Sequence, residues 1–519
     1  MMRWSWSLLS LLLALLLLLS GCVNPGEGPM TEATEPSQTE STQAPTTEAT
    51  EPPTTEATEV PTTEATEVPT MEATEAPTSE ATEAPTTEAT EPPTTEATGP
   101  PTTAPTAPPE TEPIVPPSDV DELIAQADFI AAGYDYDRAI ALIEAAGRQD
   151  ELAHKIEEYQ TAKSKLKRYS RPDTVTHIFF HSLIVDTERA FDGDFDSGGY
   201  NMYMTTVEEF IGILEQMYDR GYVLISPYDL AHEDASGKFV YGDIMLPPGK
   251  TPFLMSQDDL NYYSYMISSG NGKNETPYFA DEANDGFASR IVIGPDGYPT
   301  CEYVDADGNV LYGDYDLVPV LETFIQAHPD FSYRGARAIL GMTGYEGVFG
   351  YRTKPSYETA MGSEAYAQEV ADAKAVAQCL RDHGWVLASH SYGHPAYGNI
   401  SADRVATDSD KWERTVETII GETDVILYPH GSDIHNWKKY TFENEKFAAL
   451  YEDGYRYFFN VDSNTYWNQL GDNYFRGGRR NLDGFRMYHN PDKLEDLFDV
   501  STVFDPRRPL PVPSIGGGM

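Results

Sequence analysis

The sequence is poor in cysteine and in positive charge. It contains 3 Cys in 519 residues, which excludes a disulfide-rich scaffold. Lys and Arg number 35 against 84 Asp and Glu, and the formal net charge is -49. A nucleic-acid partner is excluded because phosphate binding requires clustered Lys and Arg. Such an acidic chain is also unsuited to peripheral attachment to anionic lipid.

Long apolar runs are absent from the sequence except at its start, "MMRWSWSLLSLLLALLLLLSGC". Arg3 precedes a leucine-rich stretch that is too short for a full membrane span, which predicts a signal peptide over residues 1–21. The ending "LSGC" resembles the bacterial lipobox and implies that Cys22 becomes the lipidated first residue. A plain signal peptide followed by an incidental cysteine is the alternative. Lipidated Cys22 would anchor the protein in the lipid bilayer, at the outer face of the bacterial cell membrane.

Residues 22–117 lack the large apolar side chains that a core requires. From residue 31 they repeat "PTTEATEP" and "PTTEATEV", and residues 23–117 contain 19 Glu with no Lys, Arg or Asp. Proline-rich, self-repelling sequence of this kind predicts a disordered, semi-stiff linker. At about 3.1 Å per residue, the repeat region could span at most about 270 Å.

The segment 118–170 changes character and shows apolar residues at helical spacing after Ser/Asp cap residues. We expect a small helical neck there. Cys301 and Cys379 are the two cysteines left after lipidation, and we expect both to be buried as small apolar residues.

Residues 171–505 alternate between apolar runs and amphipathic stretches. Seven runs predict buried strands: "HIFFHSLI", "YVLIS", "TPFLMS", "ARAILGM", "WVLASH", "DVILYP" and "YRYFFNV". Helical patterns between most of them predict an α/β fold with a parallel sheet, either open or closed into a barrel. Residues 270–315 interrupt the alternation and predict a β-hairpin insertion. The stretch that begins with "DADGN" has no Gly at the sixth position and no Glu at the twelfth position of a calcium loop, so a plain turn is expected. Residues 506–519 form a C-terminal tail.

Two of the predicted strands end in side chains that suit a metal site. "TPFLMSQDD" ends in Asp258 and Asp259, and "WVLASHSYGH" carries His390 and His394. The carboxyl ends of the strands in a parallel barrel form one active face. One carboxylate and two imidazoles hold Zn²⁺ and leave positions open for water and substrate. A second carboxylate beside the metal suits a general base.

Four motifs follow one another along the chain: "FFHS" at 179–182, "SQDDL" at 256–260, "HSYGH" at 390–394 and "YPHG" at 428–431. Their order resembles the NodB homology domain of polysaccharide deacetylases, the carbohydrate esterase family 4, over roughly residues 174–489. The resemblance implies a distorted (β/α) barrel, an acetylated polysaccharide as substrate and a divalent metal, expected to be Zn²⁺.

Carried onto this sequence, the resemblance makes Asp258 the catalytic base and Asp259, His390 and His394 the metal ligands. The family also uses a late histidine as general acid. His489 in "MYH" is the candidate for that role.

Further residues are expected around the pocket. Pro429, His430, Tyr392 and Trp467 are predicted to bind substrate, with a backbone N–H near His430 stabilising the oxyanion. Trp437 and Tyr466 also suit stacking on sugar rings, although Tyr and Trp equally fill protein cores. His181 is expected to line the pocket or support the ligands.

The first motif departs from the family, which has Phe and Gly where this chain has Gln257 and Leu260. Because Leu disfavours positive φ, the loop after Asp259 is expected to differ from the family's. No Arg stands two residues before Pro429, where some members pair an Arg with the base.

Three functions are compatible with these patterns. The first is a metal-dependent deacetylase acting on N-acetyl or O-acetyl groups of a cell-wall or extracellular polysaccharide, expected to be monomeric. The second is a non-catalytic glycan-binding lipoprotein of the same fold. The third is a glycoside hydrolase with paired carboxylates, to which the histidine pair lends little support.

Overall fold

The computed structural model describes residues 115–267, 285–462 and 467–514. The expected signal peptide, Cys22, the repeat linker and Tyr466 lie outside these residues. Within the three described ranges, we find no helix that combines the length and the apolar character needed to cross a bilayer.

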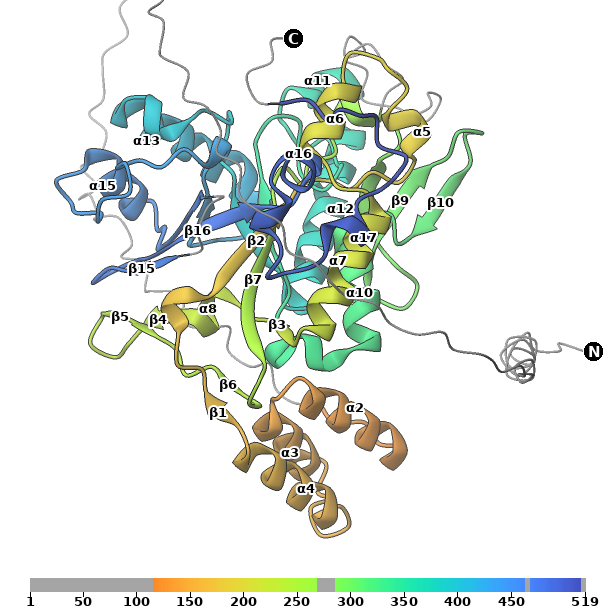
Figure 1. The fold of residues 1–519 in the computed structure, drawn as a ribbon, viewed down its shortest axis with the longest axis vertical. Coiled ribbons are helices and arrows are strands. Elements are labelled where there is room, and N and C mark those ends of the chain that lie inside the picture. The colour runs from red at the N-terminus through yellow and green to blue at the C-terminus, as the bar shows by residue number, and fades with distance from the viewer. Residues whose placement is uncertain (1–114, 268–284, 463–466, 515–519) are drawn as a thin grey trace, which may run out of the picture. The chain divides into compact units, whose positions relative to one another are not determined.

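Three helices form the neck at residues 118–170. They contact the barrel at the amino-terminal end of its strands (Figure 1). Their apolar faces share a small core of their own. The carbonyl of Gly133 accepts a hydrogen bond from the backbone N–H of Arg334 at 2.7 Å. The Tyr134 hydroxyl donates to the carbonyl of Asp330 at 2.8 Å. The helices are α2 (Val120–Ala132), α3 (Tyr136–Ala145) and α4 (Ala153–Ser164).

Seven parallel strands close into a barrel, which confirms the predicted (β/α) barrel. In spatial order they are β2 (Thr176–Phe180), β7 (Thr251–Gln257), β11 (Ile339–Met342), β12 (Val386–Ser389), β13 (Val425–Leu427), β14 (Tyr457–Val461) and β16 (Phe475–Asn481). Pairing of β7 with β11 and of β16 with β2 closes the ring. The remaining predicted strand, β3 (Tyr222–Leu224), pairs with the amino-terminal half of β7 outside the ring.

The strands form where the sequence is apolar, because a strand covered on both faces reads as a continuous hydrophobic run. The barrel interior is packed with alternate residues such as Leu427 and Phe459. Gly341 on β11 is needed there, since a Cβ at this position would lie 2.9 Å from the Leu427 side chain. The exception is β16, a polar strand of sequence "FRGGRRN" that the apolar pattern did not predict.

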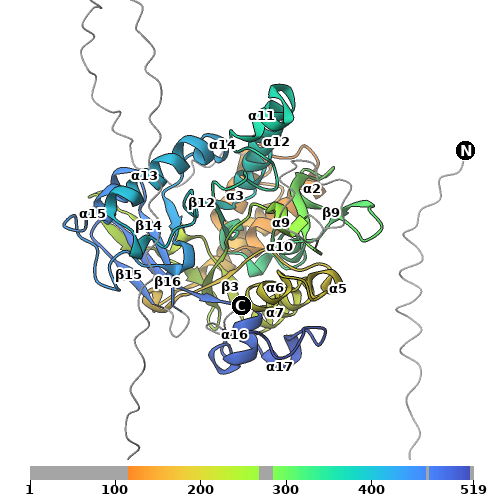
Figure 2. The same ribbon diagram turned by 90° about the horizontal axis from the view of Figure 1, so that it is seen from above.

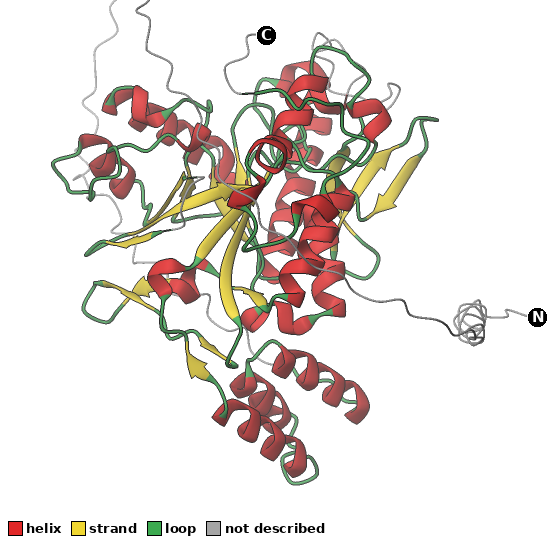
Figure 3. Ribbon diagram, in the orientation of Figure 1, coloured by secondary structure: helices red, strands yellow, loops and turns green. Residues whose placement is uncertain are grey.

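Helices cover the outside of the barrel on two flanks (Figures 1 and 3). On one flank the largest core lies between the strands and α7, α10 and α12. On the other flank α13 and α15 pack over β13 and β14 with a separate aromatic cluster. The view from above shows both sets of helices around the strands (Figure 2). The covering helices are α7 (Val207–Asp219), α10 (Leu317–Ala327), α12 (Ser363–Asp382), α13 (Ala402–Trp412), α14 (Thr418–Ile420) and α15 (Glu445–Glu452).

The predicted insertion is confirmed as an antiparallel unit of three strands rather than two. They are β8 (Ala288–Ile293), β9 (Pro299–Val304) and β10 (Val310–Gly313). The "DADGN" segment is the turn between β9 and β10, where the Asp305 carboxylate accepts the backbone N–H groups of Asp307 and Asn309. Cys301 and Cys379 are both free and buried, as expected.

Residues 504–514 pack on the barrel's outer layer. Arg508 is buried and pairs with Glu209 of α7 at 2.6 Å. The remaining short elements are α5 (Thr187–Ala190), α6 (Ser197–Tyr203), α8 (Pro227–Leu230), α9 (Ser264–Ile267), α11 (Tyr357–Met361), α16 (Gly484–His489), α17 (Val500–Val503), β1 (Lys167–Arg168), β4 (Ala231–Glu233), β5 (Phe239–Tyr241), β6 (Met245–Leu246) and β15 (Asn468–Leu470).

Candidate metal centre

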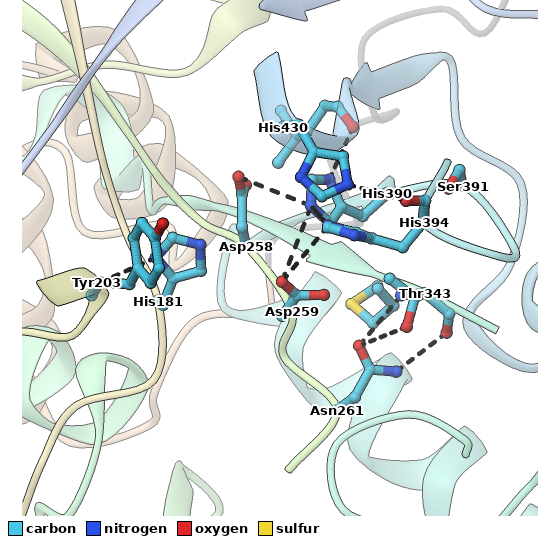
Figure 4. Close-up of polar contacts among 12 residues, drawn as sticks. His181, Tyr203, Asp258, Asp259, Asn261, Thr343, His390, Ser391, His394 and His430 are labelled. Carbon is cyan, nitrogen blue, oxygen red and sulfur yellow. Dashed lines mark hydrogen bonds and ion pairs between the residues drawn. The ribbon is translucent and has the colours of Figure 1, made fainter. Parts of the chain in front are cut away.

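Strand ends bring the predicted ligands together at the carboxyl end of the barrel. Asp258 and Asp259 follow β7, and His390 follows β12. β11 lies between these two strands, and β13, which leads to His430, is the next neighbour of β12. The side chains converge at this mouth (Figure 4).

Asp259, His390 and His394 form a three-residue cluster with one ligand atom each. The Nε2 atoms of the two histidines lie 3.2 Å apart. Asp259 Oδ2 lies 4.0 Å from His390 Nε2 and 3.8 Å from His394 Nε2. Ligands about 2.0–2.1 Å from a tetrahedral ion stand roughly 3.3 Å apart. The nitrogen and oxygen donors and their spacing therefore fit a zinc-like divalent ion.

Hydrogen bonds to the surrounding protein orient the cluster. His390 Nδ1 lies 2.8 Å from the carbonyl of Leu427, so its Nδ1 carries the proton and Nε2 presents a lone pair. The Tyr263 hydroxyl donates to Asp259 Oδ1 at 2.7 Å. Burial lowers the pKa of His394, which favours the neutral, ligating form. Burial alone would raise the pKa of Asp259, but the positive charges that His390 and His394 carry when protonated outweigh it and hold that pKa below its ordinary value.

Asp258 is buried beside the cluster and carries a partner that the sequence did not reveal. Arg479 of β16 donates from Nη1 to Oδ1 at 2.5 Å and from Nη2 to Oδ2 at 2.9 Å. Burial opposes ionisation of Asp258, yet the Arg479 guanidinium overcomes it and holds the pKa well below its ordinary value. The carboxylate is thus ionised, and its Oδ2 lies 3.8 Å from His390 Nε2.

Further contacts hold the Arg479 side chain in place. The guanidinium lies over the Phe179 ring at 4.4 Å and also donates to Ser256 Oγ at 3.2 Å. The sequence contains one indication of an arginine partner. A buried carboxylate needs a positively charged side chain, and the segment "GGRR" offers Arg479 and Arg480. Nothing in the sequence selects Arg479, because its partner stands 221 residues away.

His181, which follows β2, faces the site from the side of Asp258 (Figure 4). Its Nδ1 lies 3.2 Å from the carbonyl of Tyr203, so the neutral ring donates from Nδ1 and turns Nε2 away from that carbonyl. The charge of a protonated His181 would help to lower the pKa values of Asp258 and Asp259.

His489 is not brought to this site. It ends α16, where its Nε2 lies 2.9 Å from the carbonyl of Val512 and its ring contacts those of Phe485 and Tyr488. No contact found for His489 among the described residues reaches Asp258 or the cluster.

Only some of the predicted substrate-binding residues lie at the site. His430 lies at the site: its ring is 4.4 Å from that of His394, and its Nε2 is 3.2 Å from the carbonyl of His394. Pro429 is buried beneath it. Tyr392 turns away, with its ring 3.8 Å from Lys411 Nζ and packed on Gly344.

Trp467 lies before β15 on the outer side of β16. Its Nε1 donates to Asp462 Oδ2 at 2.9 Å, and its ring meets that of Trp437 edge to face at 5.2 Å.

The altered first motif has a structural cause. Gln257 points out of the barrel, and its Nε2 donates to both carboxylate oxygens of Asp316 at 3.1 and 3.0 Å. Asp316 caps α10 through the backbone N–H of Leu317. Gln257 therefore ties β7 to the outer helices and leaves the ligands unaffected.

Comparisons with known proteins find matches among solved structures alone. No protein-family model and no curated protein matches the chain. Among solved structures, it is similar to the Streptococcus pyogenes deacetylase PplD in complex with acetate, with 14% identity over 62% of this chain and 97% of that chain and a TM-score of 0.33. It is also similar to a polysaccharide deacetylase from Bacillus cereus, with 10% identity over 64% of this chain and 70% of that chain and a TM-score of 0.31.

Proposed function

We propose that the barrel is a metal-dependent deacetylase that hydrolyses acetamide groups, or acetyl esters, of a polysaccharide. The observation that carries this proposal is the cluster of Asp259, His390 and His394 with an ionised carboxylate, Asp258, at 3.8 Å from one of its ligands. A divalent ion bound by the cluster would supply Lewis acidity toward the acetyl carbonyl and an attacking water.

The residues of the chain divide the proton transfers between them. Asp258 is ionised and accepts the proton of the attacking water as general base. Arg479 keeps the Asp258 carboxylate fixed and unprotonated, so that the base is ready at neutral pH. His181 faces the site from the side of Asp258 and is placed to donate a proton to the leaving amine. This assigns to His181 the role that the family resemblance predicted for His489.

An acetate-release assay on N-acetylglucosamine oligomers and on purified cell wall tests the proposal. We expect release to vanish with a chelator, to return with Zn²⁺, and to be lost in Asp258→Asn and His390→Ala. His383→Ala is the matched control, because His383 precedes the opposite, amino end of β12. Activity retained in His390→Ala would contradict the proposed site.

A folded protein that binds metal and glycan but releases no acetate would instead support the non-catalytic alternative. Newly formed reducing ends would support a glycoside hydrolase.

We also propose that the protein is held on the outer face of the cell membrane through a lipid on Cys22, with the repeat linker between anchor and barrel. The motivation is the "LSGC" sequence and the long linker that follows it. Labelling of cells with a fatty-acid analogue tests this. We expect the wild type to be labelled and membrane-bound, and Cys22→Ala to be unlabelled. Label retained in Cys22→Ala would contradict it.

A further inference from the structure

A second group of acidic side chains lies on the outer layer of the barrel. Asp410 stands in the last turn of α13, Glu413 follows that helix directly, and Asp453 ends α15. The two helices pack against each other (Figure 1). One carboxylate oxygen from each residue lies within 4.8 Å of those from the other two. Three like charges this close repel one another unless a positive charge balances them.

One helix face presents two of these acids together with a serine. Ser409, Asp410 and Glu413 are three and four residues apart, so their side chains stand on the same face. Like charges at this spacing destabilise a helix, so helix stability does not explain the pair of acids. The chain continues from α13 into a single π-helical turn, Glu413–Glu417, a feature that is frequent at functional sites.

The positive charge near these acids is small. Arg414 Nη1 lies 3.6 Å from Asp410 Oδ2, but the two side chains are 68% and 53% exposed, and such exposed pairs contribute little. Burial, and then the charge of Asp453, raise the pKa of Glu413 to about 8. Two half-buried carboxylates thus face each other with little compensation among the described residues.

Two buried hydroxyl groups lie beside the carboxylates. Ser409 and Tyr455 are each 1% exposed. Among the described residues, no hydrogen-bond partner is found for Ser409 Oγ, for Tyr455 Oη or for the buried Asp453 Oδ2. Burial raises the pKa of Asp453 to about 6, and the Ser409 hydroxyl opposes this rise from outside hydrogen-bond geometry. Burial, together with the charges of Glu413 and Asp453, raises the pKa of Tyr455. Buried polar atoms in native proteins are normally satisfied, if not by protein then by water or an ion.

We propose that Asp410, Glu413 and Asp453 bind a calcium-like divalent cation, with Ser409 Oγ as a further oxygen ligand. Calcium takes six to eight oxygen ligands at about 2.3–2.6 Å in adaptable geometry, so two ligands of one ion can stand up to about 5 Å apart. The donor set contains oxygen alone, which suits a hard cation and distinguishes this site from the histidine cluster at the barrel mouth. The exposed side of Asp410 leaves room for water ligands.

The position of the site gives the cation a structural task. It lies between α13 and α15 and would fasten one helix to the other. Asp408 of α13 accepts the backbone N–H groups of Tyr392 and Gly393, both at 2.9 Å, directly before His394. A cation that fixes α13 would therefore also fix the helix that holds this loop. The proposal does not depend on the chemistry at the barrel mouth.

Calcium titration of the full-length protein, saturated with Zn²⁺, tests the site by calorimetry. The variants are Glu413→Gln and Asp453→Asn. Glu452→Gln is the matched control, because the exposed Glu452 precedes Asp453 and its replacement removes a nearby negative charge but no ligand. We expect each ligand variant to weaken calcium binding roughly tenfold or more, and the control to change it less than about threefold. Calcium bound elsewhere on the chain adds equally to all samples, so the comparison isolates this site.

Thermal unfolding gives a second readout, in which the sign of the effect changes. Without calcium, Glu413→Gln removes one of three repelling carboxylates and should unfold at a higher Tm than the wild type. With saturating calcium, the wild type should gain Tm and the variant should not, so their order reverses. The same order in both conditions would indicate acids that only share protons or face solvent, and would overturn the proposal. Absence of calcium binding by the wild type, equal weakening by Glu452→Gln, or equal stabilisation by magnesium, which requires a smaller octahedral site, would also overturn it.

Discussion

Replacement of Arg479 by Met tests how the barrel keeps its base ionised. Arg479 is 0% exposed and Asp258 is 3% exposed, and they share two short hydrogen bonds. Removing one partner of a buried ion pair costs about 3–5 kcal/mol while the other stays charged. Asp258 escapes part of this cost by taking up a proton, because without Arg479 the effect of burial, which raises its pKa, prevails.

The sign of the pH effect follows from this. The pKa of Asp258 is depressed in the folded wild type, so the ion pair stabilises the protein above the ordinary carboxyl pKa, and this is lost as pH falls through the folded value. In Arg479→Met the stabilisation by the ion pair disappears, and Asp258 is protonated over a wider pH range. We expect the acid limb of kcat/KM to move to higher pH, and kcat to fall about 100-fold from misplacement of the base.

The assay is acetate release across pH, together with urea unfolding of the same samples. Arg480→Met is the matched control, because the neighbouring Arg480 pairs with Asp496 at 2.7 Å and makes no contact with Asp258 among the described residues. It should lose stability without moving the acid limb. An unmoved acid limb in Arg479→Met, in a protein that still binds metal, would refute the assigned role of the ion pair.

Three further predictions concern the ligands, the acid and the altered motif. Asp259→Ala should lower the bound metal measured by elemental analysis to the level of a chelated sample, and full occupancy would contradict its role as a ligand. His181→Asn should keep the metal but lower kcat about 10²- to 10⁴-fold and remove the alkaline limb of the rate profile; the same result with His489→Asn instead would restore the original assignment. Gln257→Leu should leave the buried Asp316 with fewer donors and destabilise the fold by about 1–3 kcal/mol in urea unfolding, with metal content unchanged.

The apolar strands were predictable because a strand that is buried on both faces is a continuous apolar run in the sequence. All seven predicted runs are strands, and six of them lie in the ring. The seventh strand of the ring, β16, could not be found that way. Its interior-facing residue Arg479 is charged because Asp258 is charged, and Gly478 is small because a Cβ there would meet the Trp467 ring. Each of these two residue types is explained by a contact with another segment of the chain, and the apolar pattern of the strand itself does not contain that information.

The clustering of His390 and His394 with Asp259 was predictable from spacing and order, whereas the location of His489 was not. His489 and His181 are both single histidines beside apolar residues, and the sequence offers no measure of which one reaches the barrel mouth. The difference is topological: β2 is a ring strand whose carboxyl end opens on the site, while α16 packs against α6 on the outer layer. Position at the carboxyl end of a ring strand therefore decides which of the two histidines lies at the barrel mouth.

The departure at Leu260 shows how a motif changes without loss of its ligand. The sequence predicted a different loop because Leu disfavours positive φ. In the structure Asp259 itself takes the left-handed conformation, with φ of 58°, which Asp tolerates better than a bulky residue. Leu260 is then free to enter the core, where it is fully buried and its N–H donates to the carbonyl of Gly341. The strain sits on the ligand, and the neighbouring Leu anchors the loop that holds it in place.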